Sequence, residues 1–283
     1  MLVQAENCRE QFGFWRWPQL RRNCRLAYEV NPDPTVFVSA NRDDLQRIVI
    51  MNPKGGCGKT SLATSLASYF ALRGPLPTLL DCDPQGASMR WLETRSPNRP
   101  PIHGIAAYRQ SMSATRSWQL RVPQETRRLI VDTPAGIAGP DIHELVYDAT
   151  NILIPVLPSA IDIRFTAKFI AELLLLAQVD RAHIQVGIVA NRTRTNTISL
   201  QQLMRFLNSL QIPVIAILRD SQNFLAAVEQ GIGVYELPHH RAKRDIAELA
   251  KIVSWLDRWH APTGVAAHNN SAPDDAPDLI ATI

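Results

Sequence analysis

The chain has 283 residues, a hydrophobic fraction of 46% and a formal net charge of +4 at pH 7. This length suits one large α/β domain or two small ones, and the apolar content is enough for a sizeable core. The mild positive charge permits contact with nucleic acid without demanding it. We expect no membrane helix and no secretory signal, because no apolar run approaches ~20 residues and the acidic N-terminus lacks an apolar core.

Cysteine usage indicates a reducing compartment. The four cysteines, at positions 8, 24, 57 and 82, form no C-x-x-C pair and no metal-binding spacing. We therefore expect a cytoplasmic protein whose thiols are reduced and hold no metal.

The two ends of the chain differ from its middle. Residues 1–44 show no clear hydrophobic period and include a cluster of aromatic residues, Phe12, Phe14, Trp15 and Trp17. This N-terminal extension of uncertain order is interpreted as a partner-binding arm, an accessory hairpin, or sequence upstream of the true start. Residues 260–283 are polar and acidic, which predicts a disordered tail.

Residues 45–259 are predicted to form one domain in which strands and helices alternate. The expected strands are short Val/Ile/Leu runs, typical of strands buried on both faces: 47–52, 77–81, 128–132, 152–156, 185–191 and 214–218. The expected helices include 59–71, 162–177, 200–209 and 244–259. The predicted class is α/β, with a mostly parallel twisted sheet and helices on both faces.

A glycine-rich loop joins the first expected strand to the first expected helix, and it reads Pro-Lys-Gly-Gly-Cys-Gly-Lys-Thr from position 53. In this context glycines turn backbone N–H groups toward a polyphosphate, and the helix N-terminus adds partial positive charge. Lys59 is predicted to reach the β- and γ-phosphates, and Thr60 to hold Mg²⁺. The predicted nucleotide-binding residues of this P-loop are Gly55, Gly56, Cys57, Gly58, Lys59, Thr60 and Ser61.

The loop departs from the standard pattern, because Pro53 stands where a glycine is usual and Lys54 adds an early lysine. KGGxGKT with that lysine resembles the deviant P-loop of the ParA/MinD family of ATPases. The resemblance implies a P-loop NTPase fold, ATP and Mg²⁺ as cofactors, and a homodimer that sandwiches the nucleotides. It also implies that Lys54 reaches the partner's phosphates, so that Lys54 and Lys59 both have catalytic roles.

Two carboxylate motifs follow at the ends of later strands. The DxDPQG string at 81–86 resembles the first switch of the ParA family, and by that match Asp83 positions the attacking water. Asp81 is interpreted as a structural carboxylate at a strand end. The apolar run before Asp132 resembles a Walker B strand, which implies that Asp132 holds Mg²⁺ through water. The family more often has a proline where Ala135 stands.

Softer matches extend the resemblance over roughly residues 45–257. Asn191 ends a strand where the family contacts adenine, although a turn asparagine that caps its strand is an equal alternative. ParA-type dimers bind DNA without sequence preference through basic residues, and such binding is salt-sensitive. The candidates for this surface are Arg192, Arg194, Arg219, Arg241, Lys243 and Arg244.

The resemblance implies a cytoplasmic, nucleoid-associated ATP hydrolase that positions or segregates a plasmid, chromosome or large cargo. A partner protein on the cargo would stimulate hydrolysis. One alternative is a regulatory ATPase that localises proteins or controls surface-polymer synthesis without binding DNA. A MinD-like membrane cycle is disfavoured because the tail is acidic rather than basic and amphipathic. An iron–sulfur ATPase is disfavoured because all four cysteines precede Asp132.

Overall fold

The computed structural model describes residues 44–109, 122–175 and 184–259. The predicted acidic tail and nearly all of the predicted N-terminal extension lie outside these residues. Over the described ranges the chain forms a seven-stranded sheet in the order β3-β2-β4-β1-β5-β6-β7. Every neighbouring pair in it is parallel, so the expectation of a mostly parallel sheet is confirmed.

The strands match the predicted ones closely, and one strand was not predicted. They are β1 (Gln46–Ile50), β2 (Thr78–Asp81), β3 (His103–Ala106), β4 (Arg128–Asp132), β5 (Asn151–Val156), β6 (Gln185–Thr193) and β7 (Val214–Arg219). The unpredicted strand is β3, whose four residues lie at an edge of the sheet.

Seven α-helices connect or cover these strands in the described residues: α1 (Lys59–Ala71), α2 (Ala87–Thr94), α3 (Pro140–Val146), α4 (Ala160–Leu175), α5 (Ile198–Ser209), α6 (Gln222–Glu229) and α7 (His239–Leu256). Two short 3₁₀ helices are η1 (Ala107–Arg109) and η3 (Val234–Glu236). The prediction for α1 was correct at both ends. The prediction for α7 was wrong at both, because the helix begins five residues earlier, at His239, and ends at Leu256. None of these helices is long and apolar enough to cross a membrane.

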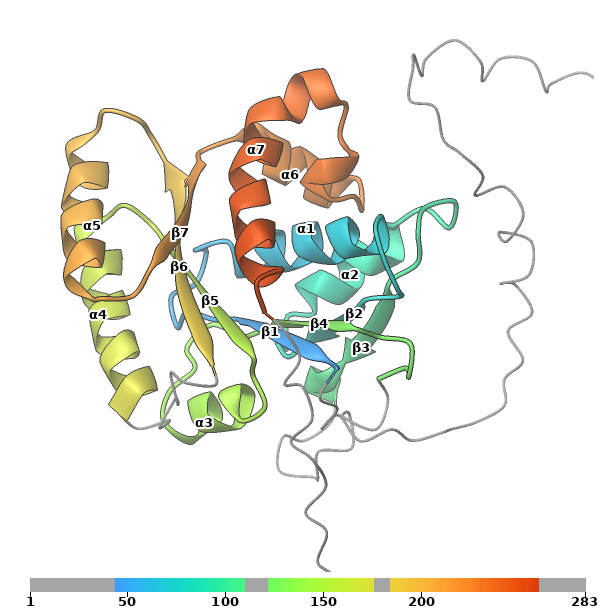
Figure 1. Cartoon of the computed structure of the whole chain (residues 1–283), viewed down its shortest axis with the longest axis horizontal. Coiled ribbons are helices and arrows are strands. Elements are labelled where there is room, and N and C mark those ends of the chain that lie inside the picture. Colours follow the sequence, from blue (N-terminus) through green and yellow to red (C-terminus); the bar gives the residue numbers. More distant parts are fainter. Residues whose placement is uncertain (1–43, 110–121, 176–183, 260–283) are drawn as a thin grey trace, which may run out of the picture. The chain divides into compact units, whose positions relative to one another are not determined.

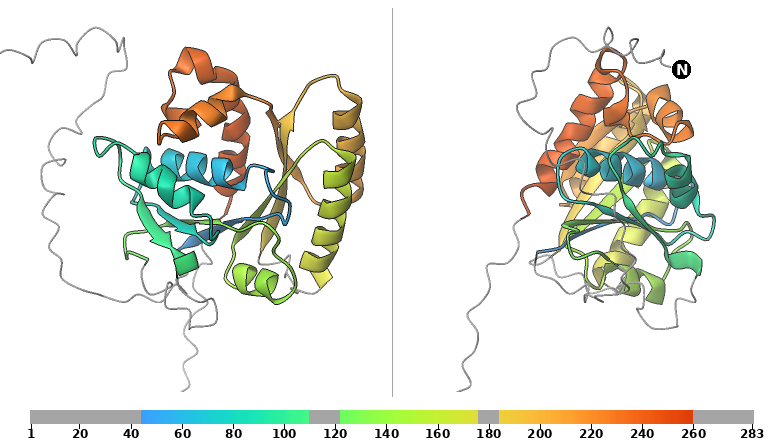
Figure 2. Two further views of the ribbon diagram at one scale, coloured as in Figure 1. Left: turned by 180° about the vertical axis from the view of Figure 1, so that it is seen from behind. Right: turned by 90° about the vertical axis from the view of Figure 1, so that its right-hand side faces the viewer.

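Helices cover both faces of the sheet, as Figures 1 and 2 show. Successive side chains of a strand point to opposite faces, so Ile48 and Ile50 of β1 pack in one core and Val49 in the other. The first core includes side chains of α1, α2, α6 and α7, and the second includes side chains of α3, α4 and α5. The central strands β1, β2 and β5 therefore read as apolar runs, because their residues are buried on both faces.

The topology places the candidate site at the carboxyl edge of the sheet. β1 lies at the centre of the sheet, between β4 and β5. Strands β2, β3 and β4 all lie on one side of β1, and β5, β6 and β7 lie on the other, so the strand order reverses after β4. Such a reversal opens a crevice beyond the carboxyl ends of the strands, where α/β proteins bind ligands. Asp81 and Asp132 are register partners at the ends of β2 and β4, so the two carboxylate motifs lie side by side.

Candidate nucleotide-binding site

The P-loop has the backbone that an anion site needs. Gly56 and Gly58 have φ values of +74° and +96°, a region that residues with a Cβ rarely adopt. Gly58 caps α1 and no side chain caps the helix, so the first N–H groups of α1 are left for an anion. Lys59 is buried, and its Nζ donates to the carbonyl oxygens of Asn52 at 2.8 Å and Lys54 at 3.1 Å. These two bonds hold the ammonium group inside the loop.

Lys54 lies at the rim of the loop. Its backbone N–H donates to Asn52 Oδ1 at 2.9 Å, and its ammonium nitrogen lies 5.8 Å from the ring centroid of Phe165 on α4. Phe165 is 53% exposed and Ile161, one turn before it, is 61% exposed. Exposed apolar side chains that lie together are typical of a surface that contacts another protein. The role of Lys54 across a dimer remains a prediction.

Asp81 and Asp83 occupy different places in the turn after β2. Asp81 is buried, and its two oxygens accept the backbone N–H groups of Asp83 at 3.0 Å and Met89 at 3.1 Å. Burial raises the pKa of Asp81, against the opposing effect of these two bonds. This arrangement agrees with a structural carboxylate. Asp83 is half-buried at the mouth of the turn, where its Oδ1 accepts the backbone N–H of Gln85 at 2.9 Å. Its role in orienting water remains a prediction.

Asp132 ends β4 and is fully buried. Its Oδ2 accepts the Ser88 hydroxyl at 2.6 Å, whereas its Oδ1 has no hydrogen-bond partner in the described residues. Burial raises the pKa of Asp132 to about 7, although the hydrogen bond from the Ser88 hydroxyl opposes the rise. A buried carboxylate oxygen without a partner is rare and calls for a bound group. The other predicted Mg²⁺ ligand, Thr60, is among the side chains that affect the pKa of Asp132.

These residues fit Mg²⁺. A hydroxyl and a carboxylate are the hard oxygen donors that this ion prefers. No group of three or more His, Cys, Asp or Glu side chains able to hold a metal occurs in the described residues. Mg²⁺ would then take its other ligands from phosphate oxygens and water, which is how it binds in nucleotide sites.

The loop after Asp132 is fastened at three points. The Thr133 hydroxyl donates to the carbonyl oxygen of Ile50 at 2.9 Å. The N–H of Gly136 donates to the carbonyl oxygen of Pro53 at 2.8 Å. The N–H of Gly139, just before α3, donates to Glu172 Oε1 of α4 at 2.7 Å. The P-loop, the loop after β4 and α4 are therefore joined by hydrogen bonds on one side of the site.

Asn191, near the end of β6, agrees with the interpretation as a strand-capping residue and also bonds the P-loop. Its Oδ1 accepts the N–H of Arg192 at 2.9 Å, as a strand-capping asparagine does, and its Nδ2 donates to the P-loop carbonyl of Cys57 at 2.7 Å. A Cβ on Gly58 would collide with this Nδ2. Asn191 thus clamps the P-loop, and a contact with adenine remains a prediction.

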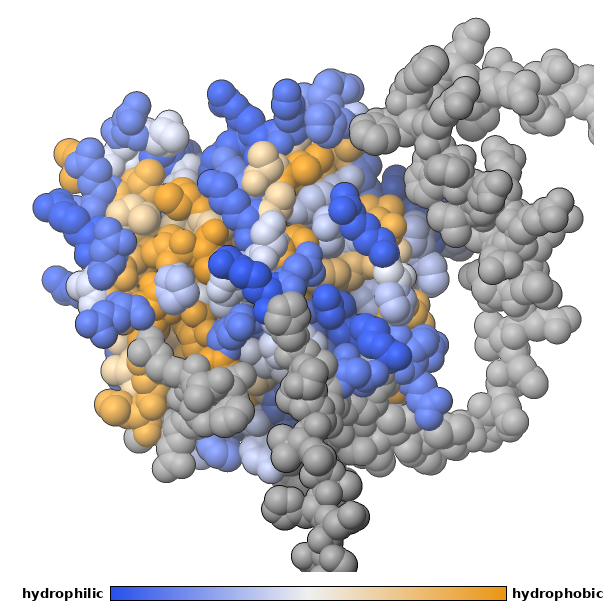
Figure 3. Space-filling view, in the orientation of Figure 1, coloured by the Kyte–Doolittle hydropathy of each residue, from blue (hydrophilic) through white to orange (hydrophobic). Residues whose placement is uncertain are grey.

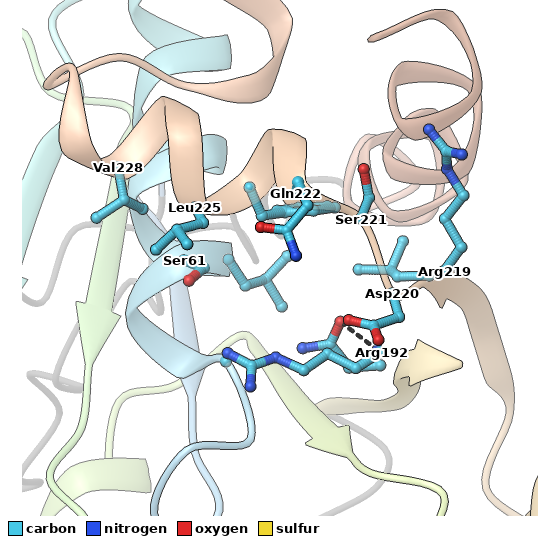
Figure 4. Close-up of a pocket in the computed structure, with 13 residues that line it drawn as sticks. Ser61, Arg192, Arg219, Asp220, Ser221, Gln222, Leu225 and Val228 are labelled. Carbon is cyan, nitrogen blue, oxygen red and sulfur yellow. Dashed lines mark hydrogen bonds between the residues drawn. The ribbon is translucent and has the colours of Figure 1, made fainter. Parts of the chain in front are cut away.

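A cavity of about 230 Å³ opens beside the P-loop. Ser61 lies on its α1 side, Gln222 and Arg192 approach it from opposite sides, and Leu225 contributes an apolar wall (Figure 4). Apolar walls with a few polar groups are typical of small-ligand sites. The place of the cavity next to Gly58 and Asn191 suits the base of a nucleotide whose phosphates lie on the P-loop.

The predicted DNA-binding residues fall into distinct places. Arg219 donates from Nε and Nη2 to the buried carboxylate of Asp245 at 2.6 and 3.0 Å, and Arg194 pairs with Asp220 at 3.0 Å. Arg219 also lines the cavity beside the P-loop, and in Figure 4 its guanidinium points away from Arg192. A groove of about 660 Å³, here called the basic groove, is lined by Thr193, Arg194, Thr195, Arg219, Asp220, Arg244, Ala247, Glu248 and Lys251.

Three of the six predicted basic residues therefore line one groove: Arg194, Arg219 and Arg244. Arg192 lines the cavity beside the P-loop and does not line the basic groove. Lys243 is exposed at the start of α7, where Figure 3 shows mainly hydrophilic side chains, and Arg241 donates to Asn223 Oδ1 at 3.0 Å. Lys251, two turns along α7 from Arg244, was not predicted because a single lysine on a helix usually marks only a solvated face.

Comparison with known proteins identifies the family. The family model for the CobQ/CobB/MinD/ParA nucleotide binding domain matches residues 48–234. The chain belongs to this family. It is therefore a nucleotide-binding ATPase of the ParA/MinD type, which confirms the predicted fold, family and enzyme class.

Two curated relatives match this chain over different lengths. Maintenance of carboxysome distribution protein A of Halothiobacillus neapolitanus is 27% identical over 191 residues, which are 67% of this chain and 87% of that protein. The chromosome-partitioning ATPase Soj of Thermus thermophilus is 44% identical over 55 residues, which are 19% of this chain and 22% of that protein.

Solved structures share the fold. A complex of a Cyanothece McdA variant with ATP has a TM-score of 0.60 and 17% identity, covering 75% of this chain and 96% of that one. MinD of Pyrococcus horikoshii complexed with Mg-ADP has a TM-score of 0.54 and 14% identity, covering 76% of this chain and 98% of that one. At these identities the likeness concerns the fold alone.

Proposed function

We propose that this ParA/MinD-type ATPase positions or segregates a large cargo. In this proposal ATP clamps two copies of the chain face to face, and the dimer binds nucleoid DNA without sequence preference. A partner protein on the cargo then stimulates hydrolysis and releases the dimer. The observation that carries the proposal is the early lysine, Lys54, which lies at an exposed apolar rim of the P-loop rather than inside it.

Phosphate binding uses the P-loop and the start of α1. The N–H groups after Gly58 donate to phosphate oxygens. The Lys59 ammonium gives up its hydrogen bonds to two backbone carbonyls and donates to phosphate oxygens in their place. This exchange costs little, because a charge-assisted bond to phosphate replaces bonds to neutral acceptors. Thr60 would hold Mg²⁺ directly and Asp132 would hold it through water, and the ion would supply positive charge that neutralises the phosphates.

Hydrolysis transfers the γ-phosphoryl group to water. Asp83 lies in the turn after β2, at the same carboxyl edge of the parallel sheet from which the P-loop leaves β1, and it orients the attacking water. Lys54 of the partner subunit and Lys59 stabilise the charge of the transition state. In this scheme the protein contributes positioning and charge, and the chemistry needs no covalent intermediate.

The relatives support a positioning role but leave the cargo open. One is named for the maintenance of carboxysome distribution and another for chromosome partitioning. Their names share the placement of a large object in the cell. ATP and Mg²⁺ are supported by the ligands named in the two structural neighbours and by the unpaired carboxylate oxygen of Asp132.

The basic groove and the exposed start of α7 are the proposed DNA surface. Arg244 and Lys251 line the groove, and Lys243 lies beside Arg244 on the same helix. Contacts between such residues and DNA phosphates release counterions, so binding should weaken steeply as salt rises. A regulatory ATPase that localises proteins without DNA is the second candidate, and it is favoured only if these residues contact no phosphate.

Replacing Asp83 tests the hydrolytic part of the proposal. Asp83→Ala is expected to lower kcat by at least about 10²-fold, because a group that positions or activates the attacking water contributes on that scale. ATP binding should persist, since the hydrogen bond that the Asp83 side chain accepts comes from Gln85 in its own turn. The measurement is phosphate release at saturating ATP together with ATP affinity. Glu93→Ala, an exposed carboxylate on α2, is the matched control and should behave as the wild type.

Hydrolysis by Asp83→Ala at the wild-type rate would contradict the assignment. Loss of nucleotide binding together with hydrolysis would also contradict it, because the residue would then act on the fold of the turn.

A further inference from the structure

Ser88 makes an unusual contact for a residue in the first turn of a helix. Its side chain is fully buried, and its Oγ donates to Asp132 Oδ2 at 2.6 Å. That distance is within the normal range of a hydrogen bond between two oxygen atoms. Ser88 belongs to α2, whereas Asp132 ends β4, so the contact joins elements 44 residues apart.

The contact is not explained by helix formation. Serine near a helix N-terminus usually bonds a backbone N–H of its own turn. Here the cap position is Gly86, with φ of +63° and no side-chain cap, and Ser88 is directed across to the carboxylate instead. The next residue, Met89, donates its N–H to Asp81 Oδ2 at 3.1 Å. The first turn of α2 is therefore bonded to both buried carboxylates at the carboxyl edge of the sheet.

The hydrogen bond from Ser88 gives the two carboxylate oxygens of Asp132 different surroundings. Oδ2 is occupied by Ser88, and Oδ1 is buried without a partner in the described residues. A carboxylate held at one oxygen loses the freedom to rotate about its terminal bond, so the other oxygen keeps one direction. The groups that orient a metal-binding carboxylate in this way usually affect metal affinity by roughly 10- to 100-fold.

We propose that Ser88 is a positioning residue for the divalent cation of this site: its hydroxyl holds Asp132 so that Oδ1 faces the ion or its water. The inference rests on the proposed binding of Mg²⁺ between Thr60 and Asp132. It adds to the nucleotide site a residue that contacts neither the nucleotide nor the ion. It also makes α2, the helix that follows the Asp83 turn, part of the cation site.

Cation binding in the ADP state tests the inference without using hydrolysis. Mn²⁺ binding is titrated by electron paramagnetic resonance in protein saturated with ADP. Ser88→Ala is expected to weaken Mn²⁺ binding by roughly 10- to 100-fold, while ADP binding in chelator stays close to the wild-type value. The melting temperature should fall, because Asp132 Oδ2 is then buried without a partner. Ser88→Thr, which keeps the hydroxyl, should restore most of the affinity, and Ser88→Cys, a weak donor of similar size, should not.

The controls separate this inference from the function on which it rests. Thr94→Ala removes an exposed hydroxyl from the other end of α2, and it should leave Mn²⁺ binding unchanged. If Ser88→Ala and Ser88→Cys bind Mn²⁺ like the wild type while Asp132→Ala does not, the positioning role is overturned and the cation site stands. If Asp132→Ala also binds Mn²⁺ normally, the proposed cation site itself is wrong. If Ser88→Ala fails to fold, the comparison of Ser88→Thr with Ser88→Cys decides.

Discussion

Lys54→Ala is expected to abolish ATP-dependent dimer formation and to leave ATP binding by the monomer largely intact. Lys54 contributes its ammonium at the rim of the site, while Lys59 is bonded inside the loop. In the proposed dimer, the variant leaves phosphate charge of the partner's nucleotide without the Lys54 ammonium. Leaving a buried charge unpaired at an interface costs about 2–5 kcal/mol, which corresponds to a loss of about 30- to 5000-fold in dimer affinity. Sedimentation with ATP and with ADP measures the dimer, and nucleotide titration measures the monomer.

Two further variants make that result specific. Lys168→Ala removes an exposed lysine from α4 and should dimerise like the wild type. Combining Lys54→Ala with Asp83→Ala prevents hydrolysis, so that absence of the dimer is not a consequence of turnover. A dimer of unchanged affinity in this double variant would show that Lys54 does not act across the interface.

Glu236→Gln is expected to give the largest loss of stability. Glu236 in η3 is almost fully buried, and its carboxylate accepts two hydrogen bonds from Arg95, at 2.8 and 2.9 Å, and one from Ser68 at 2.6 Å. The Arg95 side chain is also buried, so loss of the carboxylate charge leaves its guanidinium uncompensated. Breaking such a pair costs roughly 3–5 kcal/mol in the free energy of unfolding. Melting temperature and denaturant titration measure it.

The pH dependence of this effect has a definite sign. Burial raises the pKa of Glu236, but the bonds from Arg95, Gly233 and Ser68 outweigh it and leave the pKa below its ordinary value of 4.5. The stabilising contribution is therefore complete above that ordinary value and is lost as pH falls through the lowered pKa. The difference between Glu236→Gln and the wild type should shrink in that acid range. Glu229→Gln, an exposed carboxylate on α6, should show neither the destabilisation nor its pH dependence.

The elements that are longest or carry a motif were predictable from the sequence. α1 was predicted at both ends, because the glycines that end the P-loop and the apolar period after Lys59 are both local signals. β3 was missed, because four residues that include Gly104 are too few for a pattern. α7 begins five residues before its predicted start, since His239 and its neighbours carry no apolar period.

The candidate site also has parts that the sequence predicts and parts that only the fold shows. The P-loop and both carboxylate strands are contiguous motifs, and motifs of that kind can be found without a structure. The contacts of Ser88 with Asp132 and of Asn191 with Cys57 join residues 44 and 134 positions apart, so no local pattern indicates them. Which basic residues share a groove is likewise a property of the fold, because β6, β7 and α7 contribute to it separately.

The structure changes how the DNA surface should be tested. Arg219 is bonded to the buried carboxylate of Asp245, and this pairing raises its pKa. Arg219→Ala would leave Asp245 buried without its cation, so a loss of DNA binding could come from damage to the fold. Lys243 and Arg244 are exposed on α7 and make better test positions.

Binding to random-sequence duplex DNA, measured by fluorescence anisotropy across a salt series with ATP and with ADP, tests the central claim most directly. We expect tight binding only with ATP, with an affinity that falls steeply as salt rises. The Lys243→Ala, Arg244→Ala double variant should bind more weakly and with a shallower salt dependence. Equal affinity with ATP and ADP, or no binding while hydrolysis is intact, would contradict a DNA-bound positioning ATPase and favour a regulator that acts without DNA.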